Sequence, residues 1–365
     1  MPKTIVLTGG GTAGHITPNL SLIPLLIERG WQVHYIGSYS GMERDLAGRM
    51  PNVTYHGISS GKLRRYLDLK NLSDPFRVMA GAAQALRLLQ KLKPAVVFSK
   101  GGFVSVPVAW AARLTGTPLV LHESDLTPGL ANRMALGSAT RICTTFPETS
   151  QHLGGKARHT GTPIRRELFE GDRARGLSRC GFAPTGLPVL LMMGGSLGAN
   201  SINVALRQAL PKLLKSFRVI HICGKGNLDE SLSSMAGYAQ FEYVSEGLND
   251  LLAAAELIVS RAGANSIFEF LALKKPMLLI PLPLSASRGD QIDNARSFAR
   301  QGFAQVLDQD GMTVESLYDA IMDTWAKRTQ LKAAMDAQAK GDGTLAVLEE
   351  IERAAKKDKD IPQIR

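Results

Sequence analysis

Short apolar runs alternate with helical stretches along the whole chain, and this alternation constrains the fold more than any other feature. Helical stretches, with apolar side chains three and four residues apart, follow most of the strand-like runs. In the first half, these runs lie at residues 5–7, 32–36, 53–58, 95–99 and 119–121. The pattern restarts after a polar segment, with runs at residues 189–193, 218–222, 241–244, 257–260 and 277–280. Such alternation predicts parallel sheets covered by helices on both faces.

We therefore predict an α/β protein of two Rossmann-like, doubly wound domains. The first would span residues 1–164 and the second residues 188–343, joined by an irregular linker at residues 165–187. Ligands bind at the carboxyl ends of the strands in such sheets, so we expect those ends to face a cleft. It stays open whether the last predicted helix, residues 344–356, packs back on the first domain.

The opening strand runs into a glycine turn that is typical of an anion site. The turn holds Gly9, Gly11 and Gly14, and a helix is predicted to start near Thr17 with Pro18 in its first position. Free backbone N–H groups and the helix dipole would converge there. The three glycines fit G-x-G-x-x-G. A dinucleotide site also needs an acidic residue at the end of the second strand, and none occurs before Glu43, so we do not favour NAD.

Three stretches in the second half carry polar groups at predicted strand ends. A glycine turn at residues 194–198 contains Ser196, which would bind phosphate or only cap a helix. Glu269 lies in an apolar run where burial is costly, so it either reaches solvent or meets a polar ligand such as ribose hydroxyls. A polar loop leads to Gln291, and the preceding Asp290 could simply cap the helix.

Two histidines stand at predicted strand ends in the first half. His15 lies in the opening glycine turn, and His122 precedes Glu123 after the run at residues 119–121. Either histidine could be a capping or core residue. A histidine and a carboxylate that converge at such an edge would suit removal of a proton from a hydroxyl group.

The chain carries a net charge of +11 and has a pI near 9.6, which favours an anionic partner. Basic and apolar residues mix at Lys62, Leu63, Arg64, Arg65, Tyr66 and Leu67. This mixture suits a lipid surface better than a nucleic-acid groove, so we expect no nucleic acid. A solvated basic loop is an equally good interpretation.

Other classes of protein are disfavoured by what the sequence lacks. No apolar run approaches the roughly 20 residues of a transmembrane helix, and no export signal is recognisable. The three cysteines are far apart, which is typical of reduced thiols in a cytosolic protein and gives no support to a zinc site. No Asp/Glu cluster resembles a cation site, so we expect neither a metal ion nor a cofactor.

Taken together, the motifs resemble the MurG family of bacterial peptidoglycan N-acetylglucosaminyltransferases. The matching stretches are GGGTAGHITP (9–18), SKGGFVSVP (99–107), HESDLTPGLAN (122–132), GTPIR (161–165), GGSLGAN (194–200), RAGANSIFE (261–269) and SRGDQIDNA (287–295). The resemblance implies a two-domain glycosyltransferase of the B type, acting peripherally on the cytoplasmic face of the cell membrane. Such enzymes move N-acetylglucosamine from UDP-N-acetylglucosamine to the 4-hydroxyl of the muramyl sugar of lipid I, with inversion, to give lipid II. That activity serves cell-wall biogenesis, and with it cell shape and division, where other cell-wall enzymes are candidate partners.

The resemblance also implies roles for single residues. The first domain would bind the acceptor and the membrane, and the second UDP-N-acetylglucosamine. His15 would be a base or an acceptor-site residue. Donor contacts would come from Thr12, Ala13, Gly14, Arg165, Ser196, Glu269 and Gln291.

The chain departs from the family pattern at three positions. Ala13 and Asp290 replace a frequent glycine and glutamine, and Asp125 stands where the family often has Asn. The last change makes Asp125, beside Glu123, a candidate acid or base.

Two other hypotheses remain. A UDP-sugar epimerase of the same architecture would need no acceptor and no lipid-facing patch. A non-enzymatic nucleotide-sugar-binding protein would not depend on His15.

Overall fold

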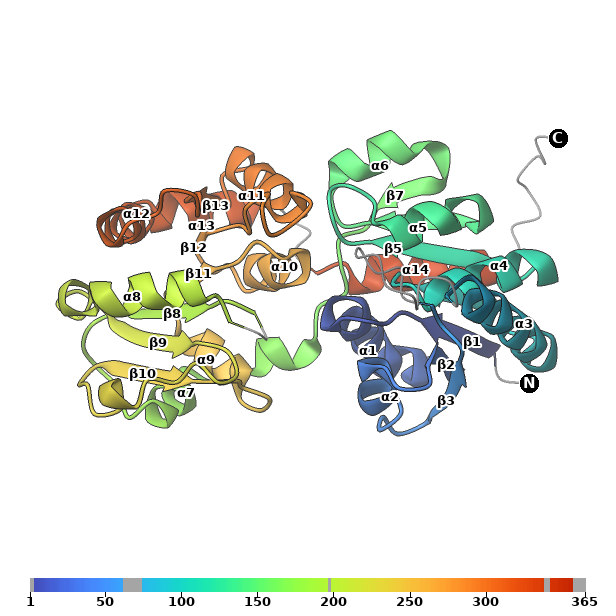
Figure 1. Cartoon of the computed structure of the whole chain (residues 1–365), viewed down its shortest axis with the longest axis horizontal. Coiled ribbons are helices and arrows are strands. Elements are labelled where there is room, and N and C mark those ends of the chain that lie inside the picture. The colour runs from blue at the N-terminus through green and yellow to red at the C-terminus, as the bar shows by residue number, and fades with distance from the viewer. Residues whose placement is uncertain (1–2, 62–73, 196–197, 338–341, 357–365) are drawn as a thin grey trace. The chain divides into compact units, whose positions relative to one another are not determined.

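The computed structural model describes residues 3–61, 74–195, 198–337 and 342–356 (Figure 1). The chain divides into two compact units. The first comprises Met1–Arg165 and Asp342–Arg365, and the second Arg166–Gly341.

A parallel sheet with strand order β3-β2-β1-β4-β5-β6-β7 forms the first unit. Its strands are β1 (Lys3–Thr8), β2 (Trp31–Ser38), β3 (Val53–Ile58), β4 (Val96–Ser99), β5 (Leu119–Glu123), β6 (Arg141–Thr144) and β7 (Ala157–His159). β1 pairs with β2 on one side and β4 on the other. The strand order therefore reverses between β1 and β4, which is where ligands bind in open α/β sheets.

Side chains of β1 alternate between two apolar cores. Ile5 and Leu7 lie in the core that includes residues of α1 (Ala13–Glu28) and α14 (Thr344–Ala355). Val6 lies in the opposite core, with α3 (Asp74–Leu92) and α4 (Ser105–Thr115). Because both faces are covered, the strands are apolar runs rather than alternating ones. The shorter helical segments are α2 (Met42–Ala47), α5 (Leu130–Ala135), η2 (Leu136–Ser138), α6 (Pro147–Leu153) and η3 (Gly154–Lys156).

The last helix, α14, belongs to the first unit and packs on α1 and on β4, β5 and β6. Figure 1 makes this return visible, since the red α14 lies among blue and green elements. Its Glu350 is 2% exposed and meets three guanidinium groups. The carboxylate lies 2.8 Å from Arg158 Nη1 and 3.1 Å from the Nη1 atoms of Arg141 and Arg353. This ion cluster ties α14 to β6 and β7.

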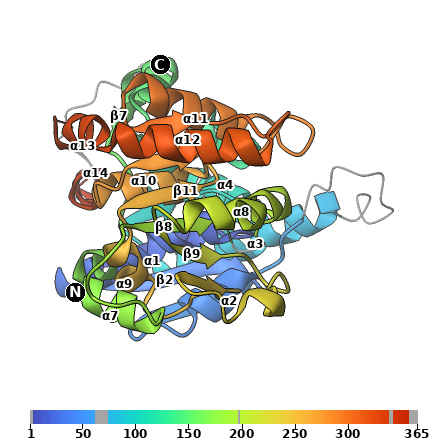
Figure 2. The ribbon, with the colours of Figure 1, turned by 90° about the vertical axis from the view of Figure 1, so that its left-hand side faces the viewer.

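A parallel sheet with strand order β10-β9-β8-β11-β12-β13 forms the second unit. Its strands are β8 (Val189–Met193), β9 (Arg218–Ile222), β10 (Tyr238–Phe241), β11 (Leu257–Ser260), β12 (Met277–Leu279) and β13 (Ala304–Val306). Figure 2 looks onto this unit from the side of α8 (Asn200–Leu213) and α12 (Val314–Ala326), whose apolar faces share one core with β8 and β11. The other segments are η4 (Arg166–Glu170), α7 (Arg173–Arg179), η5 (Glu230–Leu232), α9 (Leu248–Ala254), α10 (Ala264–Ala272), α11 (Asp290–Arg300) and α13 (Arg328–Ala337).

Three predicted element boundaries were wrong. α1 starts at Ala13 rather than near Thr17, with Thr12 at its N-cap, so Pro18 lies inside the helix. The predicted strand at residues 241–244 is β10, three residues earlier, because Tyr238 pairs with Val219 and bonds the buried His221. In addition, β5 extends through His122 and Glu123, which we expected after the strand.

The segment 165–187 is less irregular than we predicted. It contains η4 and α7, and α7 packs against α9 within the second unit. Asp172 caps α7 by accepting from Arg175 N at 2.7 Å, and the Arg175 guanidinium lies 2.8 Å from Asp250. The polar residues that suggested a linker are thus the helix cap and ion pair of a docked helix.

We expect Glu350→Gln to destabilise the first unit by about 2 kcal/mol, because a buried carboxylate that faces three arginines is lost while their charges stay. The arginines are partly exposed, and solvent screening keeps the loss below that of a fully buried pair. Urea unfolding measures the change. The control is Glu349→Gln, since Glu349 is exposed and 3.7 Å from Arg353, and it should shift stability by less than about 0.5 kcal/mol. Equal effects of both variants would contradict the role of Glu350.

Candidate active site

The glycine turn after β1 is held by bonds within the first unit. Gly11 N donates to Glu43 Oε2 at 3.2 Å, and Glu43 Oε1 accepts from Ser38 N at 3.0 Å and Ser38 Oγ at 2.6 Å. Glu43 is 1% exposed. The first acidic residue after β2 therefore turns inward and braces the glycine turn. In a dinucleotide site, an acid in that region contacts the ribose instead.

A second glycine turn, after β4, packs directly against the first. Gly10 N donates to Gly101 O at 3.3 Å. Gly102 has a φ of +84°, and a Cβ there would lie 2.1 Å from Gly10 O, so only glycine fits. The residues that flank the two turns are thereby brought together at the point where the strand order reverses.

His15 lies in the first turn of α1, where the sequence predicted a residue of the site. It is half-buried, and its Nδ1 lies 3.1 Å from Thr12 Oγ1. Burial and the nearby charge of Lys100 together lower the pKa of His15 to about 4. At neutral pH the imidazole is therefore uncharged and able to accept a proton. Thr12 and Ala13 are exposed beside it, and Gly14 is half-buried.

Glu123 and Asp125, the two carboxylates that the sequence suggested as an acid or base, differ in their surroundings. Glu123 is buried, and its oxygens accept from Asp125 N and Gly129 N, both at 3.0 Å, and from Asn132 Nδ2 at 2.8 Å. Burial raises the pKa of Glu123. Through these bonds, Glu123 holds the loop of residues 123–129 closed. Asp125 is half-buried and lies nearer the surface.

Lys100 contacts the segment that carries these two carboxylates, and the sequence analysis assigned it no role. It follows β4 directly, is 1% exposed, and its Nζ lies 2.7 Å from His122 Nδ1 and also donates to Ser124 Oγ. His122 Nε2 in turn lies 2.9 Å from Gly161 O. Burial lowers the pKa of Lys100 to about 8, while the charges of Glu123 and Asp125 oppose this shift. The signal in the sequence was a lysine directly after a buried strand and before a glycine turn.

In the second unit, the predicted donor residues follow strands that are neighbours in the sheet. Glu269 lies half-buried on α10, after β11, and Gln291 lies in the first turn of α11, after β12. Gln291 Oε1 accepts from Leu282 N at 3.1 Å. Since β8, β11 and β12 are adjacent and parallel, the segments after them meet at one edge of this sheet.

The glycine turn after β8 belongs to the same edge. Gly198 has a φ of +76°, and a Cβ there would lie 2.1 Å from Cys223 O, so this turn also depends on glycine. Ser196 falls outside the described residues, as do Lys62, Leu63, Arg64, Arg65, Tyr66 and Leu67. Arg165 lies half-buried in the coil that ends the first unit's main segment.

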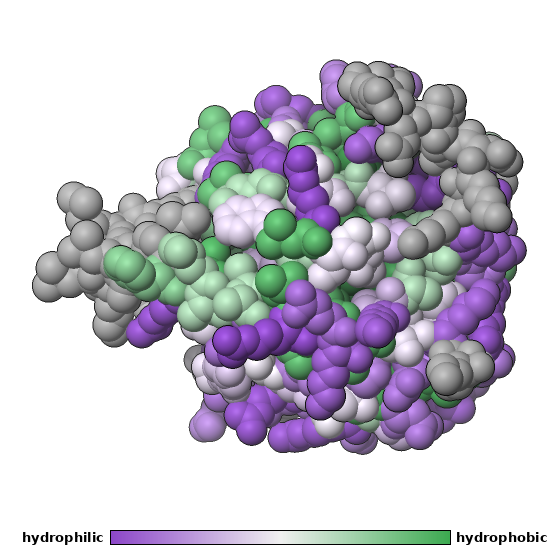
Figure 3. Space-filling model, turned by 90° about the vertical axis from the view of Figure 1, so that its right-hand side faces the viewer, coloured by the Kyte–Doolittle hydropathy of each residue, from purple (hydrophilic) through white to green (hydrophobic). Residues whose placement is uncertain are grey.

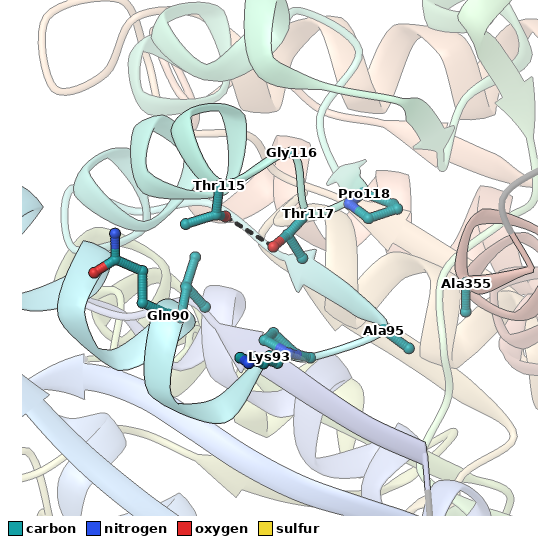
Figure 4. Close-up of a pocket in the computed structure, with 10 residues that line it drawn as sticks. Gln90, Lys93, Ala95, Thr115, Gly116, Thr117, Pro118 and Ala355 are labelled. Carbon is teal, nitrogen blue, oxygen red and sulfur yellow. Dashed lines mark hydrogen bonds between the residues drawn. The ribbon is translucent and has the colours of Figure 1, made fainter.

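A groove of about 600 Å³ lies at the opposite, amino-terminal edge of the first sheet (Figure 4). Its lining includes Lys93 to Ala95, just before β4, and Thr115 to Pro118, just before β5. It holds none of the predicted site residues.

The described residues contain neither a candidate metal site nor a candidate membrane-spanning helix. No group of three or more His, Cys, Asp or Glu side chains there could hold a metal ion. No helix in the same part of the chain has the length and apolarity needed to cross a membrane.

Comparison with known proteins identifies the family. The Glycosyltransferase family 28 N-terminal domain matches residues 5–144, and the Glycosyltransferase family 28 C-terminal domain matches residues 189–352. A UDP-N-acetylglucosamine–N-acetylmuramyl-(pentapeptide) pyrophosphoryl-undecaprenol N-acetylglucosamine transferase of Geobacillus thermodenitrificans is 55% identical over 98% of this chain and 100% of its own length. One of the same name from Lachnospira eligens is 55% identical over 93% of this chain and 96% of its own.

A solved structure agrees with these relatives. The crystal structure of Acinetobacter baumannii MurG matches with a TM-score of 0.76 and 26% identity, covering 96% of this chain and 100% of that one. The predicted fold class and the predicted resemblance are thereby confirmed. The chain belongs to glycosyltransferase family 28 and, within it, to the MurG family of N-acetylglucosamine transferases.

Proposed function

We propose that this protein transfers N-acetylglucosamine from UDP-N-acetylglucosamine to the 4-hydroxyl of the muramyl sugar of a lipid-linked muramyl-pentapeptide diphosphate. The observation that carries the proposal is 55% identity, over nearly the full length of both chains, to a transferase named for these two substrates. The polar residues that the strands of each unit present at their carboxyl ends support it.

The second unit would hold the donor. Glu269 is a half-buried carboxylate on α10, suited to accept hydrogen bonds from the two ribose hydroxyls. Gln291, at the start of α11, would contact the sugar, and Ser196 with the turn after β8 the diphosphate. Thr12, Ala13, Gly14 and Arg165 would add donor contacts from the first unit.

The reaction would be a single displacement with inversion. A base takes the proton of the acceptor 4-hydroxyl, the oxygen attacks C1 of N-acetylglucosamine, and the bond to the diphosphate breaks, so UDP leaves with the electron pair. His15, uncharged at neutral pH, and the half-buried Asp125 are the candidate bases. Backbone N–H groups at helix N-termini would stabilise the charge that develops on the leaving diphosphate.

The lipid-linked acceptor would be met at the cytoplasmic face of the cell membrane, with the protein bound peripherally. Support comes from α3, where Phe76 is 74% and Met79 69% exposed. Figure 3, drawn from the side on which α3 and α4 lie, shows hydrophobic side chains gathered on this face. An exposed aromatic and a methionine on one helix suit insertion among lipid headgroups, and the net charge of +11 suits an anionic surface.

The purified protein should form the disaccharide lipid from UDP-N-acetylglucosamine and a lipid I analogue, as measured by incorporation of radiolabelled sugar. His15→Ala should lower turnover at least tenfold while UDP-N-acetylglucosamine still binds, because the variant removes a base and not the donor site. Release of UDP or of an epimerised sugar without any acceptor would favour an epimerase. Binding without transfer in the wild type would favour a nucleotide-sugar-binding protein.

Glu269→Ala should raise the KM for UDP-N-acetylglucosamine by about 10- to 100-fold, the loss expected for hydrogen bonds to a charged group. The KM for the acceptor should stay within about twofold. Steady-state kinetics with each substrate varied in turn measure both values. Glu315→Ala, at an exposed position of α12, is the control. A parallel rise in both KM values would make Glu269 a structural residue.

Replacing both Phe76 and Met79 with Asp should weaken binding to phosphatidylglycerol vesicles by at least about tenfold, since apolar surface no longer enters the headgroup region. Vesicle sedimentation measures this. Leu345→Asp, at a 60% exposed position of α14, should leave binding unchanged. Should the double variant bind as well as the wild type, α3 would not be the membrane surface.

A further inference from the structure

Lys100, directly after β4, is a buried charged side chain that the proposed chemistry does not use. It is 1% exposed, and it follows β4, the neighbour of β1, whose glycine turn leads into α1 and His15. Leaving an ammonium group in the interior is costly unless other groups compensate its charge. The structure must therefore supply partners for it, and those partners show what the lysine does.

The partners all belong to one segment, the end of β5 and the loop after it. Lys100 Nζ lies 2.7 Å from His122 Nδ1 and donates to Ser124 Oγ. Since an ammonium only donates, His122 Nδ1 must accept, and the proton of this imidazole then lies on Nε2, which donates to Gly161 O at 2.9 Å. Residues 122 and 124 flank Glu123, so the lysine holds the strand end on both sides of that carboxylate.

The charge is compensated by the same segment. Glu123 and Asp125 are the two carboxylates whose charges favour the protonated form of Lys100. Glu123 is itself bound to Asp125 N, Gly129 N and Asn132 Nδ2, which fixes it inside the loop. Asp125, the residue after Ser124, is the half-buried carboxylate of the two.

We propose that Lys100 is a positioning residue for the acceptor side of the site, which holds the loop of residues 123–129 through His122 and Ser124 and whose charge acts on Asp125, the residue after Ser124. This inference rests on the proposed function. Without the lysine, His122 and Ser124 would lose their hydrogen bonds to the residue that follows β4. We therefore expect loss of the lysine to weaken use of the acceptor and to leave nucleotide binding unchanged.

The test is a double-mutant cycle with Lys100→Met, Asp125→Asn and the double variant. Lys100→Met should lower kcat/KM for the lipid I analogue at least tenfold, while the dissociation constant of UDP-N-acetylglucosamine, from calorimetry, stays within twofold. Asp125→Asn should lower kcat/KM for the lipid I analogue at least fivefold less in the Lys100→Met background than in the wild type, because the cation that acts on its charge is already gone. Losses that simply multiply, or a Lys100→Met variant within twofold of the wild type, would overturn the proposal.

Lys275 offers a matched control in the second unit. It is half-buried, burial lowers its pKa to about 8, and its Nζ donates to Ala253 O and Ala255 O. Lys275→Met should lower the thermal midpoint without coupling to Asp125→Asn. If Lys100→Met and Lys275→Met lowered kcat/KM equally for the same loss of midpoint, Lys100 would be only structural.

Two further measurements keep the outcomes separate. If Lys100→Met does not fold, Ser124→Ala is the alternative, because it removes one partner of Lys100 and leaves the charge of the lysine in place. This variant should lower kcat/KM for the acceptor at least threefold. An unchanged value would overturn the proposal. The thermal midpoints of the three variants can be measured without an acceptor. They therefore test the interaction between Lys100 and Asp125 even if the wild type transferred no sugar. Additive midpoint shifts would count against Lys100, whereas an inactive wild type would count against the proposed function.

Discussion

The contact between two glycine turns at the centre of the first sheet is the constraint on which this unit's site depends. Gly102 lies against the carbonyl of Gly10, and Gly10 N donates to Gly101 O. A side chain at position 102 would force the turns apart. Because β1 and β4 are the neighbours between which the strand order reverses, this contact brings His15 on α1 within range of the charge of Lys100.

Buried carboxylates then hold the loops and the last helix of the first unit in place. Glu43 braces the glycine turn after β1, Glu123 closes the loop after β5, and Glu350 ties α14 to β6 and β7. Each is surrounded by N–H donors or guanidinium groups, which is the condition for burying a carboxylate without a large loss of stability. Catalytic candidates such as His15 and Asp125 are half-buried by contrast, so a substrate hydroxyl could reach them.

Much of the fold followed from local patterns. The strands were recognisable because both faces of each sheet are buried, which makes each strand an apolar run. The starts of helices and the structure of the polar segment at residues 165–187 were harder to predict from the sequence. Pro18 looked like a helix start because its missing N–H is harmless in a first turn, yet the chain begins α1 at Ala13. Asp172 and Arg175 looked like linker residues because their partner, Asp250, is distant in sequence.

The sequence by itself determined the class of fold, the glycine turns, the family and the candidates His15, Asp125, Glu269 and Gln291, because these depend on residue types at short spacing. Only the tertiary structure decided which groups surround the buried charges. Glu123 was expected to act on a substrate, and the structure places its oxygens on backbone and side-chain N–H groups of its own loop. Lys100 had no assigned role until its contacts with His122 and Ser124 were known. The physical reason is that whether a charge is compensated depends on groups brought close by folding. The partners of Lys100 lie 22 and 24 residues further along the chain, at the end of β5 and directly after it.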